Sequence, residues 1–250
     1  MAVPIDNAIR LRPDGPSTRL DGVGFEIEFR GPVGSATDAL MQRNVSDPTL
    51  TVFRPTNGKR NNVGVIVCPG GGWRVLMLER DGIDVASWLA EQGYTAFLLK
   101  HRVHGTPASR ADYDAWEERL NSQIDLTRRG RTRFRGLGEI APYGIFRAAR
   151  EAAADDGRRA VAIVRERADE WNLSPGNVGM IGLSAGAYLA ADVAVDPQAP
   201  PLAFGHMMIV SSCDQRRRVC PTGPETRTSV RARWRSRGRG IPCRRPASAT

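Results

Sequence analysis

The hydrophobic positions of the chain form short continuous runs separated by amphipathic segments. Residues 63–68 (V-G-V-I-V-C) and 95–99 (T-A-F-L-L) are nearly continuous apolar runs, which are typical of strands buried on both faces. Between them, residues 79–92 carry apolar side chains at helical spacing and precede Gly93, a common residue after a helix. Strand, helix and strand in this order predict a βαβ unit with parallel strands and a right-handed crossover.

The same alternation continues in the second half of the chain. Residues 157–171 have an apolar stripe at helical spacing and predict an amphipathic helix, and residues 178–183 (V-G-M-I-G-L) predict a buried strand. A helical segment of small residues follows from Ala185, and residues 203–211 read as a further strand. The pattern predicts an α/β fold with a mostly parallel central sheet flanked by helices, as one domain over residues 1–215.

Other regions are less regular. Residues 1–43 are rich in turn formers and are expected to lie across the surface, with one strand near residues 24–29. Residues 50–53 (L-T-V-F) alternate in polarity and stop at Arg54 and a proline, as an outer antiparallel strand would. Residues 105–150 contain one short helical pattern and little else that can be buried, which is typical of a lid or binding loop or of a poorly ordered insertion.

Charge is concentrated at one end of the chain. The net charge is +9, and residues 216–250 hold 11 arginines and a single acid, so the rest of the chain is nearly neutral. We expect a disordered tail that binds nucleic acid or other polyanions only nonspecifically. The first residues lack an apolar signal core, and no run is long enough to cross a bilayer, so we expect a cytoplasmic protein without a membrane partner.

The four cysteines do not suggest a cofactor or a cross-linked framework. They are Cys68, Cys213, Cys220 and Cys243, without C-x-x-C spacing and without a neighbouring histidine pattern. Such spacing favours neither a zinc site nor a set of disulfides. We therefore expect no metal and no cofactor.

The first candidate for chemistry is the pentapeptide G-L-S-A-G at residues 182–186. It lies between a predicted strand and a predicted helix, where two glycines allow a strained turn that lifts the serine hydroxyl above the sheet. Ser184 is therefore the candidate nucleophile. The alternative is that Ser184 merely begins a helix, because this pentapeptide is common.

The second candidate is the loop P-G-G-G-W at residues 69–73, directly after the first buried strand. Consecutive glycines let peptide N–H groups approach a ligand closely, as an oxyanion requires. A phosphate-binding loop and a simple flexible turn are the alternatives. The loop and Ser184 each follow a parallel strand, so both should lie at the carboxyl edge of one sheet, where sites of open α/β sheets form.

Together these motifs resemble those of the α/β-hydrolase superfamily. P-G-G-G-W, the segment D-G-I-D-V-A-S-W-L-A-E-Q-G-Y-T-A-F-L-L-K-H-R and G-L-S-A-G-A-Y-L-A are similar, over about residues 45–212, to the esterase branch with acetyl xylan esterase-like and hormone-sensitive-lipase-like enzymes. The resemblance implies hydrolysis of small, short-chain or acetyl esters. It implies that Ser184 is the nucleophile and that Gly71, Gly72 and Ala185 are the oxyanion donors. We also expect Trp73 and Tyr188 to bind the substrate. Pro69 and Ala187 depart from the family's usual histidine and glycine.

The carboxyl end departs further. In these hydrolases an acid and a histidine follow the serine, yet residues 216–250 contain no histidine and almost no large apolar residue. We therefore expect a chain truncated or frame-shifted after about residue 212, with Asp214 as a vestigial acid and with impaired activity. His206 is expected at the far end of its strand from Ser184, which leaves His101 and His104 as the first residues to test as a base.

Two further expectations follow from the shortened sheet and the missing base. An open edge at the last strand favours poor solubility or homodimerisation. A protein without its base is also compatible with a different function, that of a catalytically inactive, hydrolase-like binding protein whose basic tail contacts nucleic acid or other polyanions.

Overall fold

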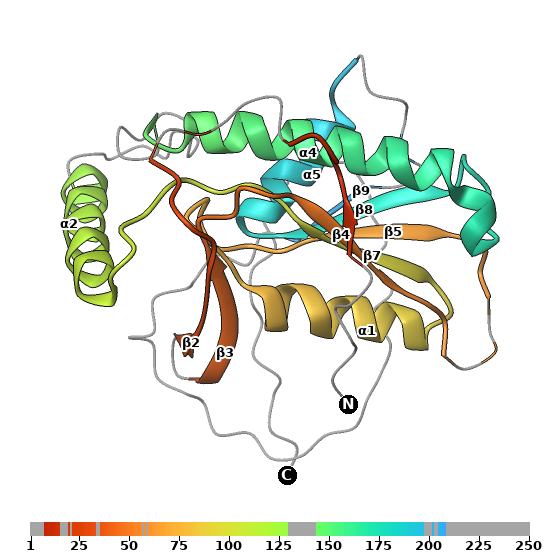
Figure 1. Cartoon of the computed structure of the whole chain (residues 1–250), viewed down its shortest axis with the longest axis horizontal. Helices are drawn as coiled ribbons and strands as arrows, with labels where there is room; N and C mark the ends of the chain where they lie inside the picture. The colour runs from red at the N-terminus through yellow and green to blue at the C-terminus, as the bar shows by residue number, and fades with distance from the viewer. Residues whose placement is uncertain are drawn as a thin grey trace, which may run out of the picture. The chain divides into compact units, whose positions relative to one another are not determined.

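The computed structural model describes residues 8–15, 20, 22–33, 36–56, 58, 60–129, 144–197, 202 and 205–208. Within these ranges the central sheet has its parallel strands side by side and its antiparallel strands at one end (Figure 1). In spatial order the strands are β1 (Ile9–Arg10), β4 (Thr49–Phe53), β7 (Thr95–Lys100), β5 (Gly64–Cys68), β8 (Val178–Leu183) and β9 (Gly205–Met208). β7, β5, β8 and β9 are parallel, and β4 pairs antiparallel with β7 and with β1.

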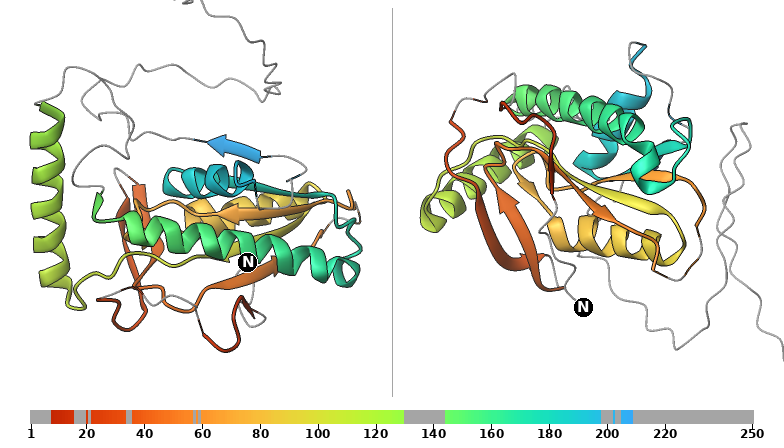
Figure 2. Two further views of the ribbon diagram at one scale, coloured as in Figure 1. Left: turned by 90° about the horizontal axis from the view of Figure 1, so that it is seen from above. Right: turned by 45° about the vertical axis from the view of Figure 1, so that its right-hand side comes forward.

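Helices cover both faces of this sheet. α1 (Asp84–Glu91) lies on one face, and α4 (Arg147–Glu166) and α5 (Ala185–Ala194) lie on the other (Figures 1 and 2). Alternate residues of β5 point to opposite faces: Val65 and Val67 pack with α1, and Ile66 packs in the cluster that includes α4 and α5. The predicted α/β fold class and the parallel βαβ unit are therefore confirmed.

The amino-terminal residues contribute more structure than the sequence predicted. β2 (Ile27–Val33), β3 (Ala36–Arg43) and β6 (Val75–Leu76) form a separate antiparallel sheet, and Leu11 is only 1% exposed. The described residues up to 43 therefore do not all lie at the surface as predicted, since Leu11, Ala39 and Met41 are buried. β4 is also not the outermost strand of the central sheet, because β1 pairs with its free edge.

Two helices differ from their predicted bounds. α4 begins at Arg147, ten residues before the predicted start at Gly157, and is followed by the 3₁₀ turn η3 (Ala168–Trp171). Gly157 lies inside α4 because α5 packs against it: a Cβ at this position would come within 2.9 Å of Val193 and Leu189. The predicted helix over residues 79–92 is a π-helical turn, η1 (Leu78–Ile83), continued by α1.

Part of the predicted lid is regular helix. α2 (Arg110–Arg129) spans 20 residues beyond one end of α4 (Figure 2), and its Tyr113 and Leu120 are buried. The rest of residues 105–150 is described only in part, since residues 130–143 lie outside the described ranges. The predicted boundary at residue 215 and the arginine-rich tail also lie outside them. None of the helices in the described ranges has the length and apolar character needed to span a bilayer.

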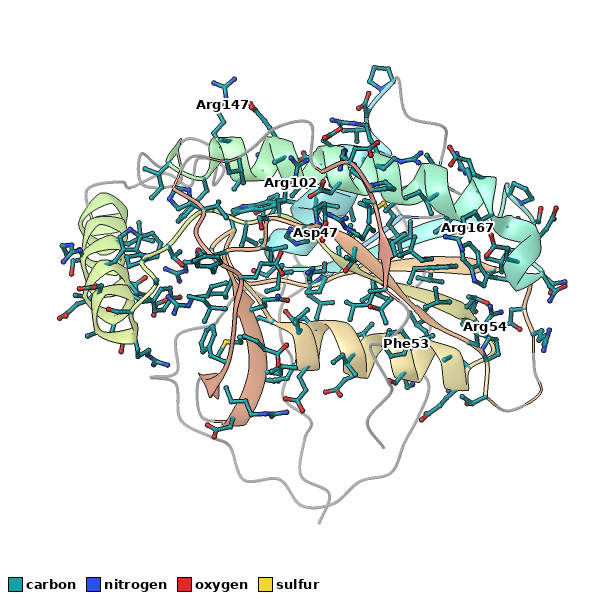
Figure 3. The ribbon with its side chains drawn as sticks, viewed as in Figure 1. Asp47, Phe53, Arg54, Arg102, Arg147 and Arg167 are labelled. Atoms are coloured by element: carbon teal, nitrogen blue, oxygen red, sulfur yellow. The ribbon has the colours of Figure 1, made fainter. Side chains whose placement is uncertain are left out.

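A cluster of buried and partly buried charges joins three distant segments. We define the Arg102 cluster as Arg12, Arg102, Asp155 and Asp156, which come from the chain after β1, the chain after β7 and the middle of α4. The Arg102 guanidinium contacts both carboxylates, with its Nη2 2.8 Å from Asp156 and 3.0 Å from Asp155, beneath α4 (Figure 3). Arg12 donates to the same two carboxylates at 2.7 and 2.8 Å.

Candidate active site

Ser184 occupies a strained turn between β8 and α5. Its φ of 50° and ψ of −116° are unusual for a residue with a side chain, and such a strained strand-to-helix turn is the geometry of a nucleophile elbow. The flanking glycines are required by close packing. A Cβ at Gly182 would overlap the carbonyl of Gly186, and one at Gly186 would overlap the carbonyl of Cys68. Gly182 therefore allows the turn to close on itself, and Gly186 allows it to rest on the end of β5.

The glycine loop after β5 is also held in an uncommon conformation. Gly71, Gly72 and Trp73 have φ values of 134°, 63° and 67°. The carbonyls of Gly70 and Gly71 accept hydrogen bonds at 3.0–3.3 Å from N–H groups within residues 74–77. In a trans peptide the N–H points away from the carbonyl, so the N–H groups of Gly71 and Gly72 face the other side of the loop. Within the described part of the chain, neither N–H has a protein acceptor.

The loop and the elbow are in contact because β5 and β8 are parallel neighbours. Cys68 pairs with Gly182 at the carboxyl ends of the two strands. A Cβ built on Gly70 would stand 2.7 Å from the carbonyl oxygen of Leu183 and 3.1 Å from the Cβ of Ser184. The backbone of the glycine loop therefore lies directly beside the serine.

A pocket of about 630 Å³ opens where the loop, the elbow and α4 meet. Five of the residues singled out from the sequence line it: Gly72, Trp73, Ser184, Ala185 and Tyr188. Gly71, also predicted as an oxyanion donor, is not among the lining residues, and Asp214 lies outside the described ranges. The roles predicted for all of these residues stay predictions. The pocket brings together Gly72, Ser184 and Ala185, but Gly71 does not line it.

The opposite wall of the pocket was missed by the sequence analysis. It is one face of α4, with Arg147, Arg150, Glu151, Ala154 and Arg158 at helical spacing. These positions precede or adjoin Gly157, where the sequence pattern placed the start of the helix. The sequence contains one indication of this wall. Arg147, Arg150 and Arg158 lie seven or four residues from Ala154, a spacing that places them on one face of a helix that begins before Gly157.

Each arginine of this wall is paired with an acid. Arg150 binds Asp192 of α5 through two hydrogen bonds of 2.6 and 2.7 Å, and its guanidinium lies 5.9 Å from the ring centre of Tyr188. Arg158 pairs with Asp196, and Arg147, which projects outward from α4 (Figure 3), pairs with Glu151. The wall is therefore polar, and its positive and negative groups balance.

The two histidines proposed as alternative bases are held elsewhere. His101 is 1% exposed, with Nδ1 2.9 Å from the carbonyl oxygen of Arg102 and Nε2 3.3 Å from that of Pro69, and burial lowers its pKa. His104 packs against Trp116 and Phe146, and partial burial lowers its pKa as well. Neither histidine lines the pocket.

His206 and Cys68 also lie away from a catalytic position. His206 pairs with Ile181, three residues before Ser184, so it is level with the body of β8 rather than with the elbow. Cys68 is completely buried, which raises the pKa of its thiol and suits a packing residue. Among the described side chains, no group of three or more His, Cys, Asp or Glu could hold a metal ion.

One carboxylate at the site was not singled out from the sequence. Asp81 of η1 accepts a hydrogen bond from the N–H of Gly70 at 3.2 Å, and burial raises its pKa. Its sequence neighbourhood, E-R-D-G, reads as an ordinary polar helix start, so only the tertiary structure reveals its place beside the glycine loop.

Comparisons with known proteins point to esterases. No family model matches the chain. An acetylxylan esterase of Xylanibacter ruminicola is 26% identical over 152 residues, which is 59% of this chain and 22% of the relative. The chain thus spans about a fifth of the length of the curated relative it matches.

Solved structures similar to the chain have names of the same kind. An acetyl ester-xyloside bifunctional hydrolase from Caldicellulosiruptor lactoaceticus is 21% identical over 76% of this chain and 46% of its own, with a TM-score of 0.39. The apo form of Thermogutta terrifontis esterase 2 is 20% identical over 59% of this chain and 41% of its own, with a TM-score of 0.36. The sheet, the serine elbow and the curated relative together confirm the predicted resemblance to α/β-hydrolases of the esterase type.

Proposed function

We propose that this protein is a carboxylic-ester hydrolase that acts on small esters, with short acyl chains or acetyl groups, through Ser184. The observation that carries the proposal is that Ser184, Gly72 and Ala185 line the same pocket. The acetylxylan esterase relative supports the ester as the substrate class. Trp73 and Tyr188 line the same pocket and would flank the bound ester.

In the proposed reaction, the Oγ of Ser184 attacks the ester carbonyl carbon and forms a tetrahedral intermediate. The N–H groups of Gly71, Gly72 and Ala185 stabilise the negative charge that develops on the carbonyl oxygen. Ala185 is the first residue of α5, so its N–H has no acceptor within the helix. Collapse of the intermediate breaks the C–O bond to the alcohol, which leaves with a proton passed by solvent water in place of the one lost from the Ser184 hydroxyl. Water then attacks the acyl group on Ser184, releases it as the carboxylic acid and restores the hydroxyl.

Activity should be weak because, among the described residues, no histidine lines the pocket to accept the hydroxyl proton. His101 and His104 do not line the pocket, and the proposed acid Asp214 has no identified histidine to orient. Loss of the base in a serine hydrolase lowers the rate by several orders of magnitude, and the oxyanion hole alone preserves a residual enhancement of about 10³-fold over water.

The test is hydrolysis of 4-nitrophenyl acetate with and without added imidazole. We expect a slow basal rate that imidazole, acting as an external base, increases in the native protein beyond its increase in Ser184→Ala. Ser174→Ala is the matched control, since Ser174 is exposed and outside the pocket. Equal rates for the native protein and Ser184→Ala would contradict the proposal and favour a catalytically inactive, hydrolase-like binding protein.

A further inference from the structure

The peptide bond between Pro69 and Gly70 is held at both ends by ionisable side chains. Its N–H donates to Oδ2 of Asp81 at 3.2 Å, and its carbonyl oxygen lies 3.3 Å from Nε2 of His101. The two side chains come from different elements, since Asp81 belongs to η1 and His101 follows β7. This peptide is the first of the glycine loop, so whatever fixes it also fixes the direction in which the loop leaves β5.

Both side chains are at least partly buried, and burial of an ionisable group costs free energy because its charged form loses contact with water. His101 is 1% exposed and Asp81 is half-buried, and burial lowers the pKa of His101 and raises that of Asp81. Buried polar groups without a compensating role usually reduce stability. The Arg102 cluster recovers this cost through charge pairing. Asp81 instead accepts the first N–H of the glycine loop, and His101 faces the carbonyl oxygen of Pro69 with Nε2 and that of Arg102 with Nδ1.

The position of Gly70 matters because it touches the serine elbow. A Cβ at Gly70 would stand 2.8 Å from Oδ2 of Asp81 and 3.1 Å from the Cβ of Ser184, so the carboxylate and the serine flank the same point. The next two peptides carry the N–H groups of Gly71 and Gly72. A displacement of about 1 Å in such groups can cost about 100-fold in rate.

We propose that Asp81 and His101 are positioning residues that clamp the Pro69–Gly70 peptide and thereby aim the N–H groups of Gly71 and Gly72 at the pocket of Ser184. This inference deepens the proposed function and depends on it for its catalytic consequence. The clamp itself is a property of the loop and can be measured without turnover.

The proton on His101 determines how firmly the carbonyl end is held. A neutral imidazole carries one N–H, and two carbonyl oxygens, those of Arg102 and Pro69, face its two nitrogens. Only the proton on Nε2 serves the clamp. Glutamine at this position can offer its amide N–H to Pro69, whereas phenylalanine keeps a ring and offers no donor.

The experiment compares Asp81→Ala, Asp81→Asn, His101→Phe and His101→Gln, with Asp84→Asn as the control because Asp84 is exposed on the neighbouring helix. The first readout is hydrogen exchange of the backbone amides in residues 70–77, in proteins whose circular dichroism matches the native one. The second is the rate at which a fluorophosphonate probe labels Ser184, which reports the oxyanion hole because the phosphoryl oxygen must occupy it.

We expect Asp81→Ala to speed exchange in this segment by about tenfold or more and to slow labelling by about tenfold. Asp81→Asn should restore both to within about threefold, because its amide oxygen can accept the N–H of Gly70. At the other end of the peptide, we expect His101→Phe to speed exchange and slow labelling in the same way, and His101→Gln to restore both. The test therefore remains possible if either Asp81→Ala or His101→Phe does not fold.

The outcomes separate the two proposals. Unchanged exchange in both Asp81→Ala and His101→Phe would overturn the clamp, whatever the labelling rate. Faster exchange in these two variants, combined with no labelling of Ser184 in the native protein, would support the clamp and contradict the proposed esterase function. Faster exchange with an undiminished labelling rate would overturn the positioning role, and failure of asparagine and glutamine to rescue would overturn the hydrogen-bond mechanism.

Discussion

The Arg102 cluster and the loop-and-elbow region use buried polar groups in opposite ways. In the Arg102 cluster each charge faces an opposite charge, and Asp156 accepts hydrogen bonds from both Arg12 and Arg102. In the loop and elbow, Trp73 and Ser184 have positive φ angles that residues with a side chain rarely adopt, and the N–H groups of Gly71 and Gly72 have no acceptor in the described part of the chain. The first arrangement stabilises the fold, and the second leaves donors available to a ligand.

Removal of a charge from the cluster should have the largest effect on stability. Asp156→Ala leaves the buried guanidinium of Arg102 without its main partner, and breaking a buried ion pair in this way costs about 3–5 kcal/mol. Urea denaturation should show the loss as a lower midpoint. Glu151→Ala is the control, because its ion pair with Arg147 is exposed and should contribute nothing measurable. Equal midpoints for both variants would show that the cluster does not stabilise the fold.

A methyl group added at the serine elbow should disrupt the packing of the loop-and-elbow region. In Gly186→Ala the new Cβ meets the backbone carbonyls of Cys68 and Pro69, which cannot rotate away, so we expect destabilisation of about 3 kcal/mol together with loss of Ser184 labelling. Thermal denaturation measures the first effect. Gly176→Ala, where no atom lies within 4 Å of the new methyl, should match the native protein. A native-like Gly186→Ala would mean that the elbow does not pack on β5 as described.

The smallest expected effect is the pH dependence from the buried histidine. Because burial lowers the pKa of His101 below its ordinary value of 6.5, the folded state binds a proton less readily than the unfolded state. The stability from this group is complete above pH 6.5 and is lost as pH falls toward the lowered pKa. The urea midpoint should therefore be lower at pH 5.5 than at pH 7.5, and His101→Phe should reduce the difference. A larger difference in the variant would contradict this sign.

The sequence predicted the elements in which local pattern and tertiary environment agree. The glycine loop and the elbow were found because glycines directly follow apolar runs, and such runs are buried strands in an α/β sheet. The start of α4 was misplaced because Gly157 reads as a break, whereas close approach by α5 requires a residue without a side chain there. The roles of Asp81 and His101 could not be predicted, because residues far apart in sequence meet only once β5, β7 and η1 are assembled.

The measurement that tests the central claim most directly is a crystal structure of the protein after reaction with a small fluorophosphonate. The account predicts a covalent bond from phosphorus to Oγ of Ser184, with the phosphoryl oxygen at hydrogen-bond distance from the N–H groups of Gly72 and Ala185. An adduct on another residue, or one on Ser184 whose phosphoryl oxygen points away from the glycine loop, would contradict it.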